Sequence, residues 1–205
     1  MVIQDLKPSQ RIKGRWLAVM EDGSILRLGE NEVIQFALYR GKELTNEESE
    51  LLAQSARRSG LKEKALSLLT RKHQSRKELE HKLEEWEATQ EESAEICDRL
   101  EELGFLDDVR YARQIVQHYC AKGYGAHKLR DELYRRGVPR ELWDGALEQA
   151  EDPSHGIDAF LEKKLKGSHD PKELKKASDA LARRGYSWTE ISEGLRRYGA
   201  DVEDI

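Results

Sequence analysis

The stretch HKLRDELYRRGV (residues 127–138) reads as a short amphipathic helix that stops at Arg-Arg-Gly. The same ending recurs 48 residues later as RRGY (183–186), and a leucine, Leu133 or Leu181, stands four residues before each glycine. Glycine adopts the left-handed conformation that closes a helix without a Cβ penalty. Two helices with the same ending therefore predict an internal repeat.

The repeat extends in both directions from this stretch. First helices begin at alanines spaced 47 residues apart, and second and third helices follow with matching apolar positions. A three-helix unit of this length cannot bury its apolar stripe alone, so we expect three tandem copies that stack into an elongated, curved array. The corresponding positions are Ala65, Ala112 and Ala159 in first helices; 77–83, 127–133 and 176–182 in second helices; and Ile96/Leu100, Trp143/Leu147 and Ile191/Leu195 in third helices.

The N-terminal segment has a different pattern. RWLAVM and SILRL flank EDGS, and Asp22-Gly23 between apolar runs favours a tight β-hairpin; NEVIQFAL then predicts a brief helix. The expected fold is mainly α, with this hairpin in front of the helical repeats. The expected parts are 1–44 (hairpin extension with short helix), 45–60 (lid helix), 61–104 (repeat 1), 105–152 (repeat 2) and 153–205 (repeat 3).

Helix boundaries are marked by their terminal residues. A serine or threonine followed three residues later by glutamate predicts a capping box at Thr45, Ser75, Thr89 and Ser187, and Asp170-Pro171 predicts another helix start. Predicted helix-ending glycines are Gly104, Gly123, Gly137, Gly167, Gly185 and Gly199. Trp143 and Trp188 fall in the helical core pattern, so we expect both to be packing anchors.

Two adjacent aspartates, Asp107 and Asp108, precede the first helix of repeat 2. Paired carboxylates can hold a metal, but no third carboxylate or histidine is spaced to complete a site. An aspartate at a helix start accepts amide hydrogen bonds and lies favourably in the field of the helix dipole. We expect Asp107 to be a cap, and Asp108 to gain from the dipole or to pair with Arg110 or Arg113. Similarly, KGYGAHK (122–128) lacks the spacing of a phosphate loop and reads better as a helix–helix turn.

Composition narrows the class of function. The formal net charge is −5, and even the most basic segment, residues 111–150, carries only seven basic against five acidic side chains. Because a domain that binds bare DNA is usually strongly basic, this balance favours a protein partner. No apolar run is long enough to span a membrane and the N-terminus does not resemble a secretory signal, so we expect a cytoplasmic monomer. The two cysteines and six histidines show no metal-site spacing; no metal, cofactor or catalytic residue is predicted.

Basic residues recur at equivalent positions of the repeats. If the array stacks as expected, the Arg-Arg pairs line a common edge that faces acidic protein or phosphate. The competing interpretation is a solvated face whose bases complement helix C-termini, and the sequence leaves both open. Candidate partner-binding residues are Arg71, Arg76, Lys77, Lys128, Arg130, Arg135, Arg136, Arg183 and Arg184.

Three stretches carry a family resemblance: RKHQSRKELEHKL (71–83), LEELGFLDDVRYA (100–112) and KGYGAHKLRDELYRRGV (122–138). They resemble the signature of the RecX family, bacterial regulators of the RecA recombinase. The match is dense from about 65 to 150 and looser to 200. Motif residues for which we expect a structural role are Asp107, Asp108, Gly125, Leu133 and Gly137.

The resemblance implies three three-helix repeats and a function without chemistry. Such a protein binds the RecA–DNA filament and inhibits ATP hydrolysis, strand exchange and coprotease activity, which modulates recombinational repair and the SOS response. The alternative that the Arg-Arg pairs leave open is a helical repeat protein that binds single- or double-stranded DNA directly. A generic helical scaffold for another partner is the third hypothesis.

Overall fold

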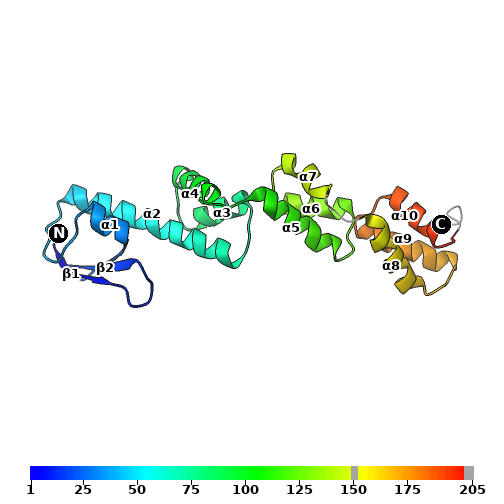
Figure 1. Ribbon diagram of the computed structural model, residues 1–205, viewed down its shortest axis with the longest axis horizontal. Helices are drawn as coiled ribbons and strands as arrows, with labels where there is room; N and C mark the ends of the chain where they lie inside the picture. The colour runs from blue at the N-terminus through cyan, green and yellow to red at the C-terminus, as the bar shows by residue number, and fades with distance from the viewer. Residues whose placement is uncertain (149–151, 201–205) are drawn as a thin grey trace. The chain divides into compact units, whose positions relative to one another are not determined.

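The computed structural model describes residues 1–148 and 152–200. Helices dominate this part of the chain, and one three-stranded antiparallel sheet lies at the N-terminus (Figure 1). The mainly helical class with an N-terminal β-hairpin is thereby confirmed. The elements are β1 (Ile3–Pro8), β2 (Arg15–Met20), β3 (Ile25–Gly29), α1 (Glu30–Gln35), α2 (Asn46–Arg71), α3 (Arg76–Glu85), α4 (Gln90–Glu102), α5 (Asp108–Cys120), α6 (Ala126–Arg135), the 3-10 helix η1 (Arg140–Leu142), α7 (Trp143–Leu147), α8 (Pro153–Leu165), α9 (Pro171–Arg183) and α10 (Trp188–Arg197).

The chain divides into two compact units. Residues 1–72 and 80–105 form the first, and residues 73–79 together with those from 106 onward form the second. The last five residues of the expected third repeat, 201–205, and the segment 149–151 at the end of the second lie outside the described residues.

In the first unit the strands follow the order β1-β2-β3, and one face of the sheet is buried. The buried face carries apolar side chains that pack with Leu52 of α2; these are Ile3, Ala18, Met20 and Leu28. The predicted hairpin is the β2–β3 pair, which turns at Gly23 with a positive φ of 82°. Strand β1 is an addition to that prediction: it pairs with β2 through an irregular register between Ile3 and Asp5.

Helix α2 differs from the expected lid helix ending at residue 60. It is one continuous 26-residue helix, so Gly60 lies in its interior. A glycine inside a helix costs about 1 kcal/mol relative to alanine. Burial of leucines on both sides of that glycine, Leu52 and Leu61 among them, outweighs this cost.

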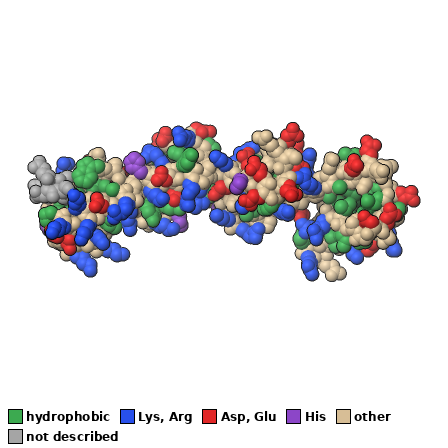
Figure 2. All heavy atoms as spheres, turned by 180° about the vertical axis from the view of Figure 1, so that it is seen from behind, with side chains coloured by type: hydrophobic (Ala, Val, Ile, Leu, Met, Phe, Trp, Pro, Cys, Tyr) green, Lys and Arg blue, Asp and Glu red, His purple; other side chains and the backbone are tan. Residues whose placement is uncertain are grey.

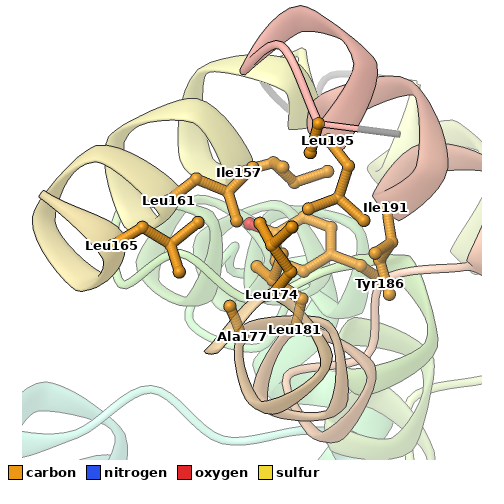
Figure 3. Packing of buried hydrophobic residues seen from close by; sticks show 10 residues of the cluster. Ile157, Leu161, Leu165, Leu174, Ala177, Leu181, Tyr186, Ile191 and Leu195 are labelled. Atoms are coloured by element: carbon orange, nitrogen blue, oxygen red, sulfur yellow. The ribbon is translucent and has the colours of Figure 1, made fainter. Parts of the chain in front are cut away.

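The second unit contains two groups of three helices, each around its own core. Helices α5, α6 and α7 enclose one cluster that includes Tyr111, Ile115 and Leu133. Helices α8, α9 and α10 enclose the other, in which Ile157, Leu161 and Leu165 of α8 point toward α9 and α10 (Figure 3). Their i, i+4 spacing places these three side chains on one side of α8.

The helix ends follow the sequence signals. Capping boxes form at Thr45, Thr89 and Ser187, and Ser75 and Glu78 exchange the same pair of hydrogen bonds. All six predicted helix-ending glycines have positive φ.

The two tryptophans differ. The indole of Trp143 donates to the carbonyl of Val138 and packs on the α5–α7 core. Trp188 is 55% exposed, so its expected role as an anchor is wrong. It occupies the first position of α10, where Ile191 and Leu195 take the inward-facing places.

Candidate partner-binding surface and the repeat junctions

The turn Arg135-Arg136-Gly137, which ends α6, docks on the start of α3 within the second unit. The hydroxyl of Ser75 donates to the carbonyl of Arg136. At Gly137, whose φ is 68°, a Cβ atom would lie 2.7 Å from Cδ and 2.8 Å from Cβ of Lys77. Glycine thus meets two needs here, because the turn is left-handed and the neighbouring helix leaves no room for a side chain.

The equivalent turn at the end of α9 docks on the start of α6. The amide of Gly125 donates to the carbonyl of Arg184 at 2.9 Å, and the amide of His127 donates to the carbonyl of Gly185 at 3.1 Å. Amides in the first turn of a helix have no partner within it, and here the next repeat supplies one. A Cβ atom on Gly185 would lie 2.7 Å from Cβ of Lys128 and closer to its amide nitrogen.

Both junctions therefore use the same arrangement. In each, an Arg-Arg-Gly turn at the end of one second helix docks on the start of the second helix in the preceding repeat, through backbone amides at α6 and through the Ser75 hydroxyl at α3. Helices α9, α6 and the first residues of α3 are joined in this way through the second unit.

The two arginines of each pair do different work. The side chain of Arg136 is only 24% exposed; it donates to the hydroxyl of Tyr111 at 2.8 Å and lies 3.9 Å from the carboxylate of Glu78. Arg184 lies over the ring of Phe160, 4.7 Å from its centroid, and donates to the carbonyl of Gly123 at 3.4 Å. The second arginine of each pair is thus built into a junction.

The first arginine of each pair faces solvent. Arg183 is exposed, and the side chain of Arg135 is 67% exposed although it also pairs with Glu132. Glu132 receives Lys128 as well, at 3.4 Å, so Lys128, Arg135 and Glu132 form one cluster on α6. The prediction that all four arginines line an edge therefore needs to be narrowed to Arg135 and Arg183.

The other candidates are spread over both units. Lys77 and Arg130 are exposed on α3 and α6, whereas Arg76 is half-buried and its amide donates to Asp108 at 2.9 Å. Arg71 belongs to the first unit, where its Nε donates to the carbonyl of Ser67 at the end of α2.

Models of two RecX domains match the chain: the first three-helix domain matches residues 62–108 and the second matches residues 107–147. The "Regulatory protein RecX" of Xanthomonas citri is 34% identical over 145 residues, which cover 69% of this chain and 88% of that protein. The protein of the same name from Pseudomonas putida is 32% identical over 143 residues, covering 68% and 90%.

The chain belongs to the RecX family. Solved structures agree at the level of the fold. A crystal structure of regulatory protein RecX superposes with a TM-score of 0.73 at 21% identity, covering 96% of this chain and 98% of that one. The crystal structure of RecX from Lactobacillus salivarius gives a TM-score of 0.66 at 21% identity and covers 70% and 97%.

Several motif residues of this RecX-family chain have structural contacts. Asp107 is the N-cap of α5 and accepts from the amide of Arg110 at 2.8 Å. Asp108 accepts from the amide of Arg76 and so joins α5 to the start of α3, a contact that the sequence did not predict. Leu133 is fully buried in the α5–α7 core. At Gly125 a Cβ atom would lie 2.6 Å from the amide nitrogen of Tyr186.

Replacing Asp107 by alanine is expected to lower the free energy of unfolding by about 1 kcal/mol, because the amide of Arg110 loses its acceptor. Urea denaturation measures this loss. Asp107→Ser keeps an acceptor oxygen at the cap and is expected to restore most of it. Equal stability of the alanine variant and the wild type would contradict the capping role.

Three residues outside the predicted partner-binding set lie at or beside the first junction: Glu78, which was predicted only as a capping residue, Tyr111 and Glu132. The hydroxyl of Tyr111 donates to Glu78 at 3.0 Å and accepts from Arg136, so it links α3, α5 and α6. The side chain of Glu132 is only 5% exposed. One signal in the sequence could have predicted the burial of Glu132, since this residue directly precedes Leu133 on the apolar side of α6.

The junction shifts two pKa values. Burial raises the pKa of Tyr111 to about 12, and the negative charge of Glu78 adds to the effect. Burial also works to raise the pKa of Glu132, but hydrogen bonds from Arg135 and Tyr119 outweigh it, and the pKa of Glu132 lies below its usual value. Tyr111 thus stays neutral and Glu132 charged at neutral pH.

This shift predicts a loss of stability at high pH. Because the pKa of Tyr111 is higher in the folded state than in the unfolded one, its contribution is complete below pH 10 and disappears as the pH rises toward 12. Urea denaturation between pH 9 and 12 should show a flatter fall in the unfolding free energy for Tyr111→Phe than for wild type. Tyr39→Phe, at a 62% exposed site, serves as the control and should follow the wild type. Parallel curves for Tyr111→Phe and wild type would rule out the shift.

Proposed function

We propose that this chain is a non-enzymatic regulator that binds the RecA–DNA nucleoprotein filament. By binding, it inhibits RecA's ATPase, strand exchange and coprotease activity, and so modulates recombinational DNA repair and the SOS response. Membership in the RecX family supports a regulatory role, since relatives of this chain carry the name regulatory protein. The paired carboxylates considered above as metal ligands, Asp107 and Asp108, accept hydrogen bonds from backbone amides at helix starts.

The observation that carries the proposal is the solvent-facing side of the second helices. Arg135 and Arg183 occupy equivalent places at the ends of α6 and α9, and equivalent junctions hold the backbone of both turns. On α6 this solvent-facing side also carries Tyr134, which is 66% exposed, and Arg130. On α9 it also carries three exposed lysines, Lys172, Lys175 and Lys176. Exposed arginine and tyrosine are side chains typical of interfaces, and the positive charge suits an acidic partner surface.

The test is inhibition of RecA's single-stranded-DNA-dependent ATPase by titration. Arg135→Glu/Arg183→Glu is expected to raise the half-inhibitory concentration by about tenfold or more, since each replacement turns attraction into repulsion at an exposed site. Lys163→Glu/Lys164→Glu on α8 makes the same change in net charge at exposed positions and is the matched control. Circular dichroism checks that both variants fold.

Two results would count against this proposal. Wild-type protein that leaves the ATPase unchanged at several-fold molar excess over RecA would sink RecA inhibition itself. A double variant as potent as wild type would move the contact away from Arg135 and Arg183.

A second candidate is direct binding of nucleic acid by the repeats. The exposed cations of α6 and α9 favour it, because phosphate contacts are made by lysine and arginine. The affinity for DNA without RecA should then fall steeply with salt and should weaken in the same double variant. Salt-independent or undetectable binding would dispose of it.

A further inference from the structure

The N-terminal sheet has one face that the helices of its unit do not cover. Apolar residues of the strands point inward, toward α1 and α2. Because side chains alternate along a strand, the residues between them point outward. The strand register places these outward residues in two rows across the sheet, Lys7–Leu17–Arg27 and Asp5–Val19–Ile25.

Positive charge is concentrated on this outer face and on the loop that joins β1 to β2. Lys7 and Arg27 flank Leu17 in one row, and the loop adds Arg11 and Lys13, both exposed. Arg40 lies beside the outer edge of β1, where its Nε donates to the carbonyl of Gln4 at 3.1 Å. A shallow hollow of about 520 Å³ opens there, lined by Gln4, Asp5, Lys7, Val19 and Arg40.

Of the six acidic side chains in the N-terminal module, residues 1–44, three lie at the opposite end of the sheet; of the others, Asp5 is on the outer face, Glu30 follows β3 near the loop end and Glu32 is buried. Glu21 and Asp22 occupy the β2–β3 turn, and Glu43 pairs with the start of β1 through Val2. Figure 2 shows mostly Lys and Arg side chains toward the loop end of this module and mostly Asp and Glu side chains away from it. The module is therefore electrically polarised although residues 1–44 carry seven basic and six acidic side chains.

The cations of this face are largely uncompensated. Asp5, the one acid in the two outward rows, is paired with Lys7 at 3.3 Å. Within residues 1–148 and 152–200, Arg11, Lys13 and Arg27 have no ion pair. Arg15, at the end of β2, is already paired with Glu63 of α2. Three long basic side chains are thus free to meet an external anion.

We infer that this outer face, together with the 9–14 loop, is a docking surface for the phosphate backbone of duplex DNA. Neighbouring strands lie about 4.8 Å apart, so the Cα atoms of Lys7 and Arg27 are separated by roughly 10 Å, and the loop carries further charge beyond them. Duplex DNA presents one negative charge per about 1.7 Å of helix axis on two strands, which suits a broad spread of cations.

The chemistry of the face favours a duplex over a single strand. Proteins that bind single strands stack bases on aromatic rings. The outward side chains of the strands offer Leu17, Val19 and Ile25 instead, which have no ring. Cations without base-reading partners contact phosphates irrespective of sequence. The surface lies outside residues 62–147, which the RecX domain models match, and the inference does not depend on RecA inhibition.

The experiment uses the full chain and a fluorescein-labelled 30-base-pair duplex, without RecA, and measures anisotropy at several salt concentrations. Lys13→Glu/Arg27→Glu should weaken binding about fivefold to tenfold at low salt and reduce the slope of log affinity against log salt by about two. Lys62→Glu/Lys72→Glu makes the same charge change at exposed sites of the same unit and should stay close to wild type. Glutamine versions of both pairs repeat the comparison without introducing negative charge.

Four outcomes would overturn the inference. These are wild-type protein that does not bind the duplex at low salt, control variants that lose as much affinity as the test variants, a single strand of equal length that binds more tightly than the duplex, and polyglutamate that displaces the duplex more effectively than unlabelled duplex does. None of these outcomes bears on the RecA titration, so duplex binding by the N-terminal sheet and RecA inhibition can each fail without the other.

Discussion

Gly185→Ala is expected to lower the free energy of unfolding of the second unit by about 3 kcal/mol or more. A left-handed backbone costs an alanine roughly 1–2 kcal/mol, and forcing a methyl group into a packed contact costs about 1–3 kcal/mol. At Gly185 both costs apply: φ is 89°, and the new Cβ would meet the backbone of Lys128, which cannot rotate away as a side chain would. Thermal and urea denaturation measure the loss.

Gly167→Ala is the matched control for this prediction. Its φ of 88° is nearly the same, but no atom lies within 4 Å of the position where its Cβ would be. The control should pay only the backbone cost of about 1–2 kcal/mol. The difference between the two variants isolates the close approach of the turn to α6. Equal destabilisation would mean that the junction tolerates a side chain and that the close approach has no energetic weight.

Arg136→Met is expected to destabilise the second unit by about 2 kcal/mol. Methionine fills a similar volume but leaves Glu78 and the hydroxyl of Tyr111 without their basic partner. When one partner of a largely buried polar pair is removed, the group that remains has lost its contact with water without a compensating hydrogen bond. Chemical denaturation of the purified variant gives the value.

Arg135→Met, the neighbouring change, should cost about 1 kcal/mol, less than Arg136→Met, because the Arg135 side chain is 67% exposed and its buried partner Glu132 keeps Lys128 at 3.4 Å. In the RecA titration the order should be reversed: Arg135→Met should weaken inhibition of the ATPase more than Arg136→Met does, because Arg135 carries the proposed contact. If Arg136→Met were as stable as Arg135→Met, the half-buried network at the first junction would contribute nothing to stability.

Local signals in the sequence were sufficient for most helix boundaries. A serine or threonine three residues before a glutamate marks a cap whatever surrounds it, and a glycine at a helix end marks a left-handed residue. These signals depend on neighbours a few positions away, which is why Thr89, Ser187 and the helix-ending glycines were correctly interpreted.

Features that depend on distant contacts were not predictable in the same way. Gly60 resembles a helix end locally, but packing on both sides keeps α2 continuous. The alternation in β1 is too short and irregular to identify a strand without its partner β2. Trp188 has the spacing of a core residue, yet the other positions of α10 fill the core.

At the candidate surface, the sequence could not distinguish the two neighbouring arginines of each Arg-Arg pair. Both arginines of each Arg-Arg pair look alike in sequence, and only the docking of the turn decides which one is buried. The recurrence of the pair was therefore informative about a repeated arrangement. It did not reveal that one arginine of each pair belongs to the junction and the other to the solvent-facing side.

The hydrogen bonds from the amides of Gly125 and His127 have a kinetic consequence. Their acceptors belong to the next helix group, so these two protons become accessible to water when α9 separates from α6, even if every helix stays intact. Their rate of hydrogen–deuterium exchange thus reports the free energy of opening between the two helix groups, separately from that of melting either one.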